Sequence, residues 1–396
     1  MVLYISNAGA GTISQYRVES GGGLQPLFPS TVPAGGGYID RLIIDRSRHF
    51  AYGLDKSSAN TVFQYRIAPD GRLTPLSPPS LPVGKGDEGN IYLTPDGRFA
   101  YCPNTDDNTL SQFAVQPDGA LKPLSPPVVP SGKGPVALLA TPDSKHLYCA
   151  DYEGNTLFTY RVQADGQLAQ SGAPVALPAQ PIVFSFFPDS QTLYCVNVSP
   201  GSISQFHVGA DGRLSELAPA VSLPAQNLSA LALHPANRSA YVTDAGQRLF
   251  QYHVSANGSL SPLSPTEIDL PGGPGSQIAI SDTGGTTTGT RGDAFLYTNL
   301  QSNYEISQYR IAADGTLSAL PEREAENPDG APKSLAVDPT GRFLYVVNDR
   351  SGMISQYRIT GTGQLAPLSP SAVAARGSST FITIVTLPES SPHRRK

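Results

Sequence analysis

The chain has 396 residues, of which 39% are hydrophobic and 15% charged, and it contains 39 glycines and 37 prolines. This composition is typical of many short strands joined by tight turns, and it leaves little room for long helices. The net charge of −5 and the lack of a basic patch argue against a nucleic-acid partner. The longest apolar runs have only the length of a strand, so we expect no membrane insertion.

Three markers recur along the chain, mostly at intervals of 46 to 49 residues. The first is a tyrosine, found at Tyr4, Tyr52, Tyr101, Tyr148, Tyr194, Tyr241, Tyr297 and Tyr345. The second is a glutamine before an aromatic residue, found at Gln15, Gln64, Gln112, Gln205, Gln251, Gln308 and Gln356, with Thr159 in its place in the fourth unit. The third is a turn glycine, found at Gly23, Gly71, Gly119, Gly166, Gly212, Gly258, Gly315 and Gly363.

Each of the eight units divides into four strands. In the last full unit the strands are expected over 334–337, 343–347, 354–359 and 365–368, with turn residues between them. Four strands per repeat of this length are typical of propeller blades. We therefore predict an all-β fold, an eight-bladed β-propeller with four antiparallel strands per blade. Prolines in the fourth strand of most units place that strand at the outer edge, where no ladder donor is needed.

The two ends of the sequence predict how the ring closes. The chain begins at the second strand of a unit, at Leu3, and a spare apolar stretch occupies 381–385. We expect this C-terminal stretch to join the first blade as its innermost strand, within one propeller domain over 1–387 and a flexible tail over 388–396. No signal peptide is visible, and a secreted or extracytoplasmic location is slightly favoured over a cytoplasmic one.

Several segments resemble a known family of repeats. Ala240-Tyr241-Val242-Thr243-Asp244 and Leu344-Tyr345-Val346-Val347-Asn348 look like the YVTN-type repeat, and so do turns such as Thr94-Pro95-Asp96-Gly97-Arg98. The whole chain resembles the lactonase-like propeller superfamily, which includes propeller 6-phosphogluconolactonases and many secreted repeat proteins. The usual propeller of that family has seven blades, so the eight units here are a departure.

Function is expected where the units differ most, in the loops before the first strand and between the second and third strands. A lactonase would need a group that activates water and a cation that holds an oxyanion. The candidate catalytic bases are Asp40, Asp87 and Glu88, and the candidate ligand-binding residues are Arg41, Asn90, Lys333 and Arg376. The other interpretation is that these charges are solvated or tie the loops together through salt links.

Histidines and cysteines offer no further site. His49, His146 and His234 are expected on the opposite face of the ring. Cys102, Cys149 and Cys195 follow the repeat tyrosine in successive units, too far apart for disulfides, and we expect them to be buried. The slot after the third-strand aromatic residue is basic in seven units, which indicates either a cationic ring or, preferably, an inter-blade hydrogen-bond network with the nearby glutamine.

Two functions from different classes follow. The preferred one is a monomeric binding or scaffold propeller that recognises a small molecule, glycan or protein through the loops at the channel mouth. The alternative is a lactonase-like hydrolase that opens a sugar or other small lactone with carboxylate and Arg or Lys residues. Neither interpretation calls for a cofactor or a metal ion.

Overall fold

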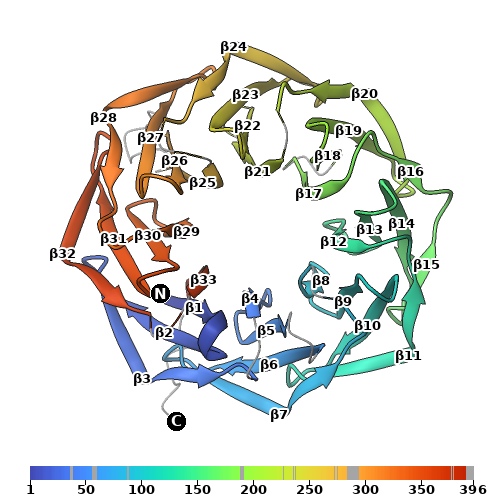
Figure 1. Cartoon of the computed structure of the whole chain (residues 1–396). Coiled ribbons are helices and arrows are strands. Elements are labelled where there is room, and N and C mark those ends of the chain that lie inside the picture. The colour runs from blue at the N-terminus through green and yellow to red at the C-terminus, as the bar shows by residue number, and fades with distance from the viewer. Residues whose placement is uncertain are drawn as a thin grey trace, which may run out of the picture.

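In a computed structural model of the chain, β-sheets stand radially around a central channel (Figure 1). The structure describes residues 1–35, 39–55, 60–86, 89–187, 191–225, 227–234, 236, 238–271, 273, 275–282, 294–375, 377 and 379–388, with only the backbone of Asp40, Ser276, Ser379 and Thr380. These residues form eight antiparallel sheets, which confirms the predicted eight-bladed propeller. The helix described among them is the short 3-10 turn η1 (Ala8–Ala10).

Each blade is given from its innermost to its outermost strand. Blades 1 to 4 consist of β33 (Ser379–Val385), β1 (Val2–Asn7), β2 (Thr12–Val18) and β3 (Leu24–Pro33); β4 (Ile39–Ile44), β5 (Phe50–Asp55), β6 (Thr61–Ile67) and β7 (Leu73–Pro82); β8 (Tyr92–Leu93), β9 (Phe99–Asn104), β10 (Thr109–Val115) and β11 (Leu121–Pro130); and β12 (Pro135–Ala140), β13 (His146–Asp151), β14 (Thr156–Val162), β15 (Leu168–Gln170) and β16 (Val175–Ala176). Blades 5 to 8 consist of β17 (Pro181–Phe186), β18 (Thr192–Asn197), β19 (Ser202–Val208) and β20 (Leu214–Ser222); β21 (Leu228–His234), β22 (Ser239–Asp244), β23 (Arg248–Val254) and β24 (Leu260–Asp269); β25 (Gly275–Asp282), β26 (Ala294–Leu300), β27 (Glu305–Ile311) and β28 (Leu317–Glu326); and β29 (Pro332–Val337), β30 (Phe343–Asn348), β31 (Met353–Ile359) and β32 (Leu365–Ala374).

The second strand of each blade lies at the centre of the packing. Every residue of β1, β9 and β30, for example, is buried. Both faces of such a strand are covered by the neighbouring blades, so its sequence reads as a nearly continuous apolar run instead of an alternation. The outermost strands, such as β7 and β11, are mostly exposed and carry the prolines, as their edge position allows.

The ring is closed by the C-terminal strand. β33 pairs antiparallel with β1, with Val2 opposite Val385 and Leu3 opposite Ile384. Ile382 packs in the core between blades 8 and 1, and Val385 packs in the core between blades 1 and 2. The spare stretch therefore completes blade 1, as its sequence predicted.

The same tyrosine hydrogen bond joins every pair of adjacent blades. Each second-strand phenol is buried and donates to the carbonyl oxygen of a turn glycine in the next blade, at 2.5–2.7 Å. The pairs are Tyr4–Gly71, Tyr52–Gly119, Tyr101–Gly166, Tyr148–Gly212, Tyr194–Gly258, Tyr241–Gly315, Tyr297–Gly363 and Tyr345–Gly22. Gly119 has a φ of +87°, and a Cβ there would lie 2.1 Å from the Phe50 ring, so this turn needs glycine for two reasons.

The repeat glutamine bridges blades in a second way. The Gln64 Oε1 accepts the Leu121 N–H of the next blade at 2.8 Å, and its Nε2 donates to Pro78 O in its own outer strand at 2.6 Å. Seven glutamines accept in this manner: Gln15, Gln64, Gln112, Gln205, Gln251, Gln308 and Gln356. The position after the third-strand aromatic residue contributes little: Arg66 donates to Asp118 O at 3.2 Å, and Arg66, Arg17, Arg161 and Arg358 are all exposed. The inter-blade network thus runs mainly through the glutamines.

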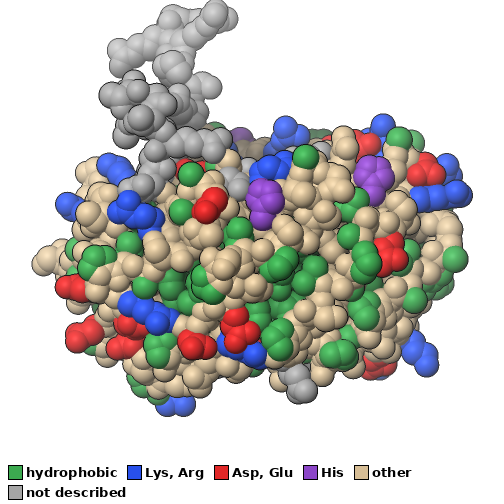
Figure 2. Space-filling model, turned by 90° about the horizontal axis from the view of Figure 1, so that it is seen from above, with side chains coloured by type: hydrophobic (Ala, Val, Ile, Leu, Met, Phe, Trp, Pro, Cys, Tyr) green, Lys and Arg blue, Asp and Glu red, His purple; other side chains and the backbone are tan. Residues whose placement is uncertain are grey.

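Blade 4 departs from the pattern at its outer edge. Its outer strand is divided into β15 and β16, which both pair with β14. The three cysteines are buried and free, as expected from their positions, and burial raises the pKa of each thiol. Figure 2 shows the molecule edge-on, with Lys and Arg interspersed with Asp and Glu over the visible surface. No helix in the described part of the chain is long and apolar enough to cross a membrane.

Ending the chain at Gly377 would remove β33. We expect this deletion to lower the free energy of unfolding by about 3–6 kcal/mol, since Ile382 and Val385 lose their burial and β1 loses its ladder partner. Urea unfolding of both chains measures the difference. A chain that ends at residue 388 keeps β33 and is the matched control. Equal unfolding midpoints for the two truncated chains would show that closure contributes nothing.

Candidate functional site

The central channel holds a cavity of about 990 Å³. All eight innermost strands contribute to its wall, and so do the loops that follow β9 and β13. The residues that line it include Arg41, Asn90, Tyr92, Thr105, Asp106, Leu138, Tyr152, Glu153, Ile182, Phe184, Ser229, Leu231, Gln277, Leu335 and Phe381. The two loop classes singled out in the sequence therefore meet at one face of the ring.

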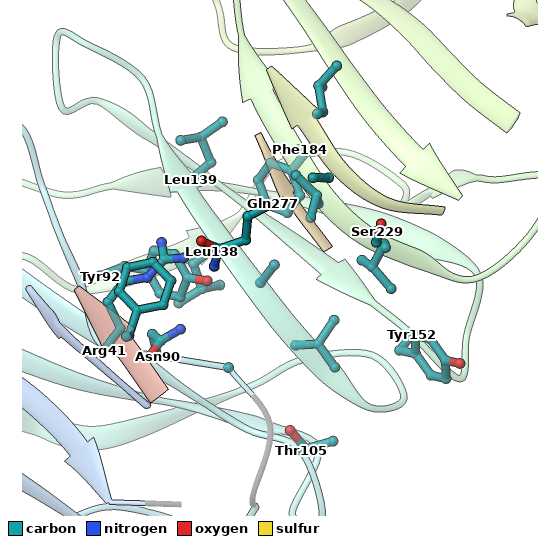
Figure 3. Close-up of a pocket in the computed structure, with 18 of the residues that line it drawn as sticks. Arg41, Asn90, Tyr92, Thr105, Leu138, Leu139, Tyr152, Phe184, Ser229 and Gln277 are labelled. Atoms are coloured by element: carbon teal, nitrogen blue, oxygen red, sulfur yellow. The ribbon is translucent and has the colours of Figure 1, made fainter. Parts of the chain in front are cut away.

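One side of the cavity is polar and aromatic. Arg41, Asn90 and Tyr92 lie together at the inner edges of blades 2 and 3 (Figure 3). The guanidinium carbon of Arg41 lies 3.9 Å from the centre of the Phe381 ring on β33, so the cation makes a cation–π contact with this ring. Burial raises the pKa of Tyr92 to about 12, against the lowering effects of a backbone hydrogen bond at Leu138 and of the Arg41 charge. The phenol is therefore neutral and can serve as a hydrogen-bond donor.

Asn90 lines this side of the cavity with its side-chain amide (Figure 3). Its Oδ1 is buried and has no hydrogen-bond partner among the described residues. A buried amide oxygen without a donor costs free energy, and such groups are rare in folded proteins. Because this oxygen is closed off from the cavity, it is not available to a bound molecule.

The opposite side of the cavity is apolar. Ile182 and Phe184 line it from β17 and Leu231 lines it from β21, and Figure 3 labels Phe184 on this side. Leu138 of β12 also lines the cavity, but it packs beside Tyr92 in the core between blades 3 and 4. The lining residues Ser229 and Gln277 use their polar atoms within the ring: the Ser229 hydroxyl donates to Gly275 O at 2.8 Å, and the Gln277 Oε1 accepts the Leu335 N–H at 3.1 Å. These bonds join inner strands of adjacent blades and keep the wall in shape.

The loops at the channel mouth are held by their own hydrogen bonds. Thr105 donates to Pro135 O at 2.8 Å, the Asn108 Oδ1 accepts the Gly134 N–H at 2.8 Å, and the Tyr152 N–H donates to Gly134 O at 2.7 Å. The loop before β12 is thus tied to the hairpin loops of blades 3 and 4. Asp106 and Glu153 place two carboxylates on this rim.

The predicted site residues are only partly brought together. Arg41 and Asn90 line the cavity. Lys333, on β29, is exposed and does not line the cavity, where Leu335 of the same strand does. The backbone of Asp40 belongs to β4 but its side chain lies outside the described part of the structure, as do Asp87, Glu88 and Arg376 entirely.

Several lining residues were missed by the sequence analysis. Tyr92, Phe184, Gln277 and Phe381 all lie on innermost strands, whereas candidates were sought in loops. Among the described lining residues there is no histidine, and the described chain contains no cluster of three metal-binding side chains. His234 ends β21 at the other end of the channel, where its Nε2 lies 3.6 Å from Asp282.

The geometry defines a closed propeller with a ligand-sized axial cavity, and the sequence places it in a family. A family model described as the seven-bladed β-propeller lactonase matches residues 124–277 and 276–381. The chain belongs to this lactonase propeller family, with eight blades where the family description has seven. A search of curated proteins found no match.

Solved structures share the fold at low sequence identity. The periplasmic gluconolactonase PpgL of Pseudomonas aeruginosa is 17% identical, with a TM-score of 0.61 over 98% of this chain and 99% of that one. A putative 6-phosphogluconolactonase of Bacteroides uniformis is 15% identical, with a TM-score of 0.61 over 97% and 99%. The dihydro-heme d1 dehydrogenase NirN is 13% identical, with a TM-score of 0.69 over 96% and 74%. At these identities the likeness is one of fold alone.

A buried carboxyl group lies directly behind the rim. Asp151 ends β13, next to the rim residue Tyr152, and is fully buried. It accepts hydrogen bonds from the Ser131 hydroxyl at 3.1 Å and the Cys149 thiol at 3.3 Å. The corresponding Asp244 of blade 6 is paired with Arg248 at 2.9 Å, but Asp151 has no cation beside it in the described structure. Burial therefore raises the pKa of Asp151 to about 6, against the lowering effect of its hydrogen bonds.

This pKa predicts a pH-dependent stability. The folded state disfavours the ionised carboxyl of Asp151. The free energy of unfolding therefore falls as pH rises from about 4, near the pKa in the unfolded chain, to about 6, the pKa in the folded protein. We expect Asp151→Asn to be more stable than the parent protein by about 2–3 kcal/mol at pH 7.5, with the gain vanishing near pH 4. Denaturant unfolding at both pH values measures this. The exposed rim variant Asp106→Asn is the control, and a gain independent of pH would contradict the assignment.

Proposed function

We propose that the protein binds a small molecule in its central channel, and that this ligand has an apolar body and one carbonyl or carboxylate group. The observation that carries the proposal is the division of the cavity wall. Arg41 and Asn90 line the cavity from blades 2 and 3, and Ile182, Phe184 and Leu231 line it from blades 5 and 6. A cavity of about 990 Å³ has the size of a pocket for a small organic ligand.

Each side of the wall would contribute a different part of the affinity. Apolar surface buried against the leucine and isoleucine side chains stabilises the complex by about 25 cal/mol per Å². The Arg41 guanidinium, supported by Phe381, can donate charge-assisted hydrogen bonds to a carboxylate or carbonyl oxygen. The Asn90 side-chain amide lies on the same part of the wall as Arg41. The apolar wall offers a glycan too few hydrogen bonds, so we favour a small amphipathic molecule among the expected partners.

The proposal predicts saturable binding of amphipathic anions. Decanoate and 1-anilinonaphthalene-8-sulfonate both combine an apolar body with one anionic group. We expect Arg41→Gln to weaken the binding of either probe by about tenfold, which corresponds to about 1.4 kcal/mol. Ala230→Phe should weaken it as much or more, because the larger side chain occupies the cavity. Dye fluorescence and isothermal titration calorimetry measure both effects.

Lys333→Gln is the matched control for the loss of charge. Lys333 is an exposed cation on an innermost strand but does not line the cavity, so its removal should leave the affinity unchanged. Absence of saturable binding to the parent protein would overturn the proposal. The same would follow if Lys333→Gln and Arg41→Gln had equal effects.

A second candidate function is lactone hydrolysis, which the family match over residues 124–277 and 276–381 favours. In this reaction a carboxylate base takes a proton from water, the oxygen of that water attacks the ester carbon, and the ring oxygen leaves with a proton. Asp40, Asp87 and Glu88 remain the candidate bases, and Arg41 would hold the developing oxyanion. The described wall has one cation, Arg41, beside two rim carboxylates, so an apolar lactone fits it better than a phosphorylated one.

A panel of alkyl-substituted γ- and δ-lactones separates the two functions. If the protein is a hydrolase, acid release in a pH-stat should exceed the uncatalysed rate. We expect that rate to fall by 10² or more in Glu88→Gln and Arg41→Ala, as for the loss of a base or an oxyanion donor. Binding of these lactones without turnover would leave the binding function standing alone.

A further inference from the structure

Equivalent positions can be compared among the eight blades. Blade 4 differs from the other seven at two neighbouring positions. The fourth residue of the outer strand is a leucine in the other seven blades: Leu27, Leu76, Leu124, Leu217, Leu263, Leu320 and Leu368. In blade 6 this leucine lies against the turn of the next blade, where a Cβ on Gly315 would be 3.5 Å from Leu263 Cδ1. Blade 4 has Ser171 at this position, and Thr159 in place of the bridging glutamine.

The two residues that differ in blade 4, Thr159 and Ser171, lie next to each other at the interface with blade 5. The Ser171 N–H donates to Thr159 O at 2.8 Å, so the two small side chains belong to the same part of the interface with blade 5. A cleft of about 310 Å³ opens there, lined by Arg161, Ala169, Gln170, Ser171, Asp211 and Arg213. In the seven other interfaces a glutamine caps the first N–H of the next outer strand, but the equivalent Leu214 N–H has no such side-chain acceptor in the described structure.

The cleft has an excess of positive charge. Arg161 is exposed and makes no ion pair or hydrogen bond with any described residue. Its counterpart Arg66 in blade 2 donates to Asp118 O at 3.2 Å and lies over the Phe50 ring at 5.2 Å. Blade 4 has His146 where blade 2 has Phe50, so Arg161 lacks that aromatic face. Arg213 pairs with Asp211 across 3.5 Å at the surface, where such pairs are weak.

We propose that this cleft between blades 4 and 5 binds the oxyanion of a small ligand, a carboxylate or a phosphate, between Arg161 and Arg213. Planar guanidinium groups match both oxyanions with paired hydrogen bonds. The Ser171 hydroxyl and the Gln170 amide supply further polar groups on the wall. The space would hold about ten water molecules at ~30 Å³ each, which is enough for a phosphate or a short dicarboxylate. The site is separate from the channel and does not depend on its ligand.

Isothermal titration calorimetry of the full chain with inorganic phosphate and with succinate, at matched ionic strength, tests the proposal. We expect saturable binding that becomes at least about tenfold weaker in Arg161→Gln. Arg66→Gln is the matched control, because it removes the same charge where Gln64 and Leu76 fill the interface. Lys333→Gln should also bind normally, because this exposed cation lines neither the cleft nor the channel cavity. Binding of phosphate alone or of succinate alone would support the site and identify its ligand class.

A double variant tests the origin of the cleft. Thr159→Gln together with Ser171→Leu restores the residues of the other blades, so it should abolish anion binding and raise Tm. The proposal is overturned if neither anion binds, if Arg66→Gln weakens binding as much as Arg161→Gln, or if the folded double variant binds as the parent does. Should the double variant fail to fold, the comparison of Arg161→Gln with Arg66→Gln decides the question.

Discussion

The structure depends on one hydrogen bond that is repeated at every interface between blades. A buried phenol donates to the carbonyl of a turn glycine in the next blade, from Tyr4 to Gly71 and finally from Tyr345 back to Gly22. A buried hydroxyl needs its partner, and the turn can approach closely only because it carries no side chain. The bond therefore holds the second strand of one blade close to the turn of the next blade at every interface of the ring.

The regular residues and the functional ones occupy different parts of each blade. The polar atoms of the repeat tyrosines and glutamines already form hydrogen bonds within the ring. Gln64, for example, bonds to one backbone group of its own blade and one of the next blade. The inner strands are free to vary, and they bring Arg41 of blade 2 and Ile182 of blade 5 to the wall of one cavity. The cleft between blades 4 and 5 also lies where the units differ, because Thr159 and Ser171 replace the glutamine and the leucine of the other blades there. In both proposed sites, the variation between the blades, more than the family fold, indicates where a ligand would bind.

The sequence predicted the fold well because each blade repeats its own markers. Tyr, Gln and Gly at fixed spacing implied eight blades, and the apolar stretch at 381–385 implied the closing strand that pairs with β1. The lining of the cavity was harder to predict. Arg41 and Asn90, chosen because the units differ most around them, do line the cavity, whereas Tyr92 lies on a two-residue strand with no detectable alternation. Lys333 lies on an inner strand but outside the cavity lining, because a charge on such a strand can point away from the channel, and sequence alone does not give that direction.

The ring of buried tyrosines also gives the molecule an optical property. The chain has 18 tyrosines and no tryptophan, so its near-ultraviolet absorption comes mainly from phenol groups. Burial raises the pKa of the interface phenols, such as those of Tyr52, Tyr148 and Tyr297, above the ordinary value. These groups therefore ionise less readily while the blades are joined than they do once the interfaces open. Phenolate formed by these buried groups, as distinct from that formed by exposed tyrosines such as Tyr152, is consequently a spectroscopic signal of an opened interface.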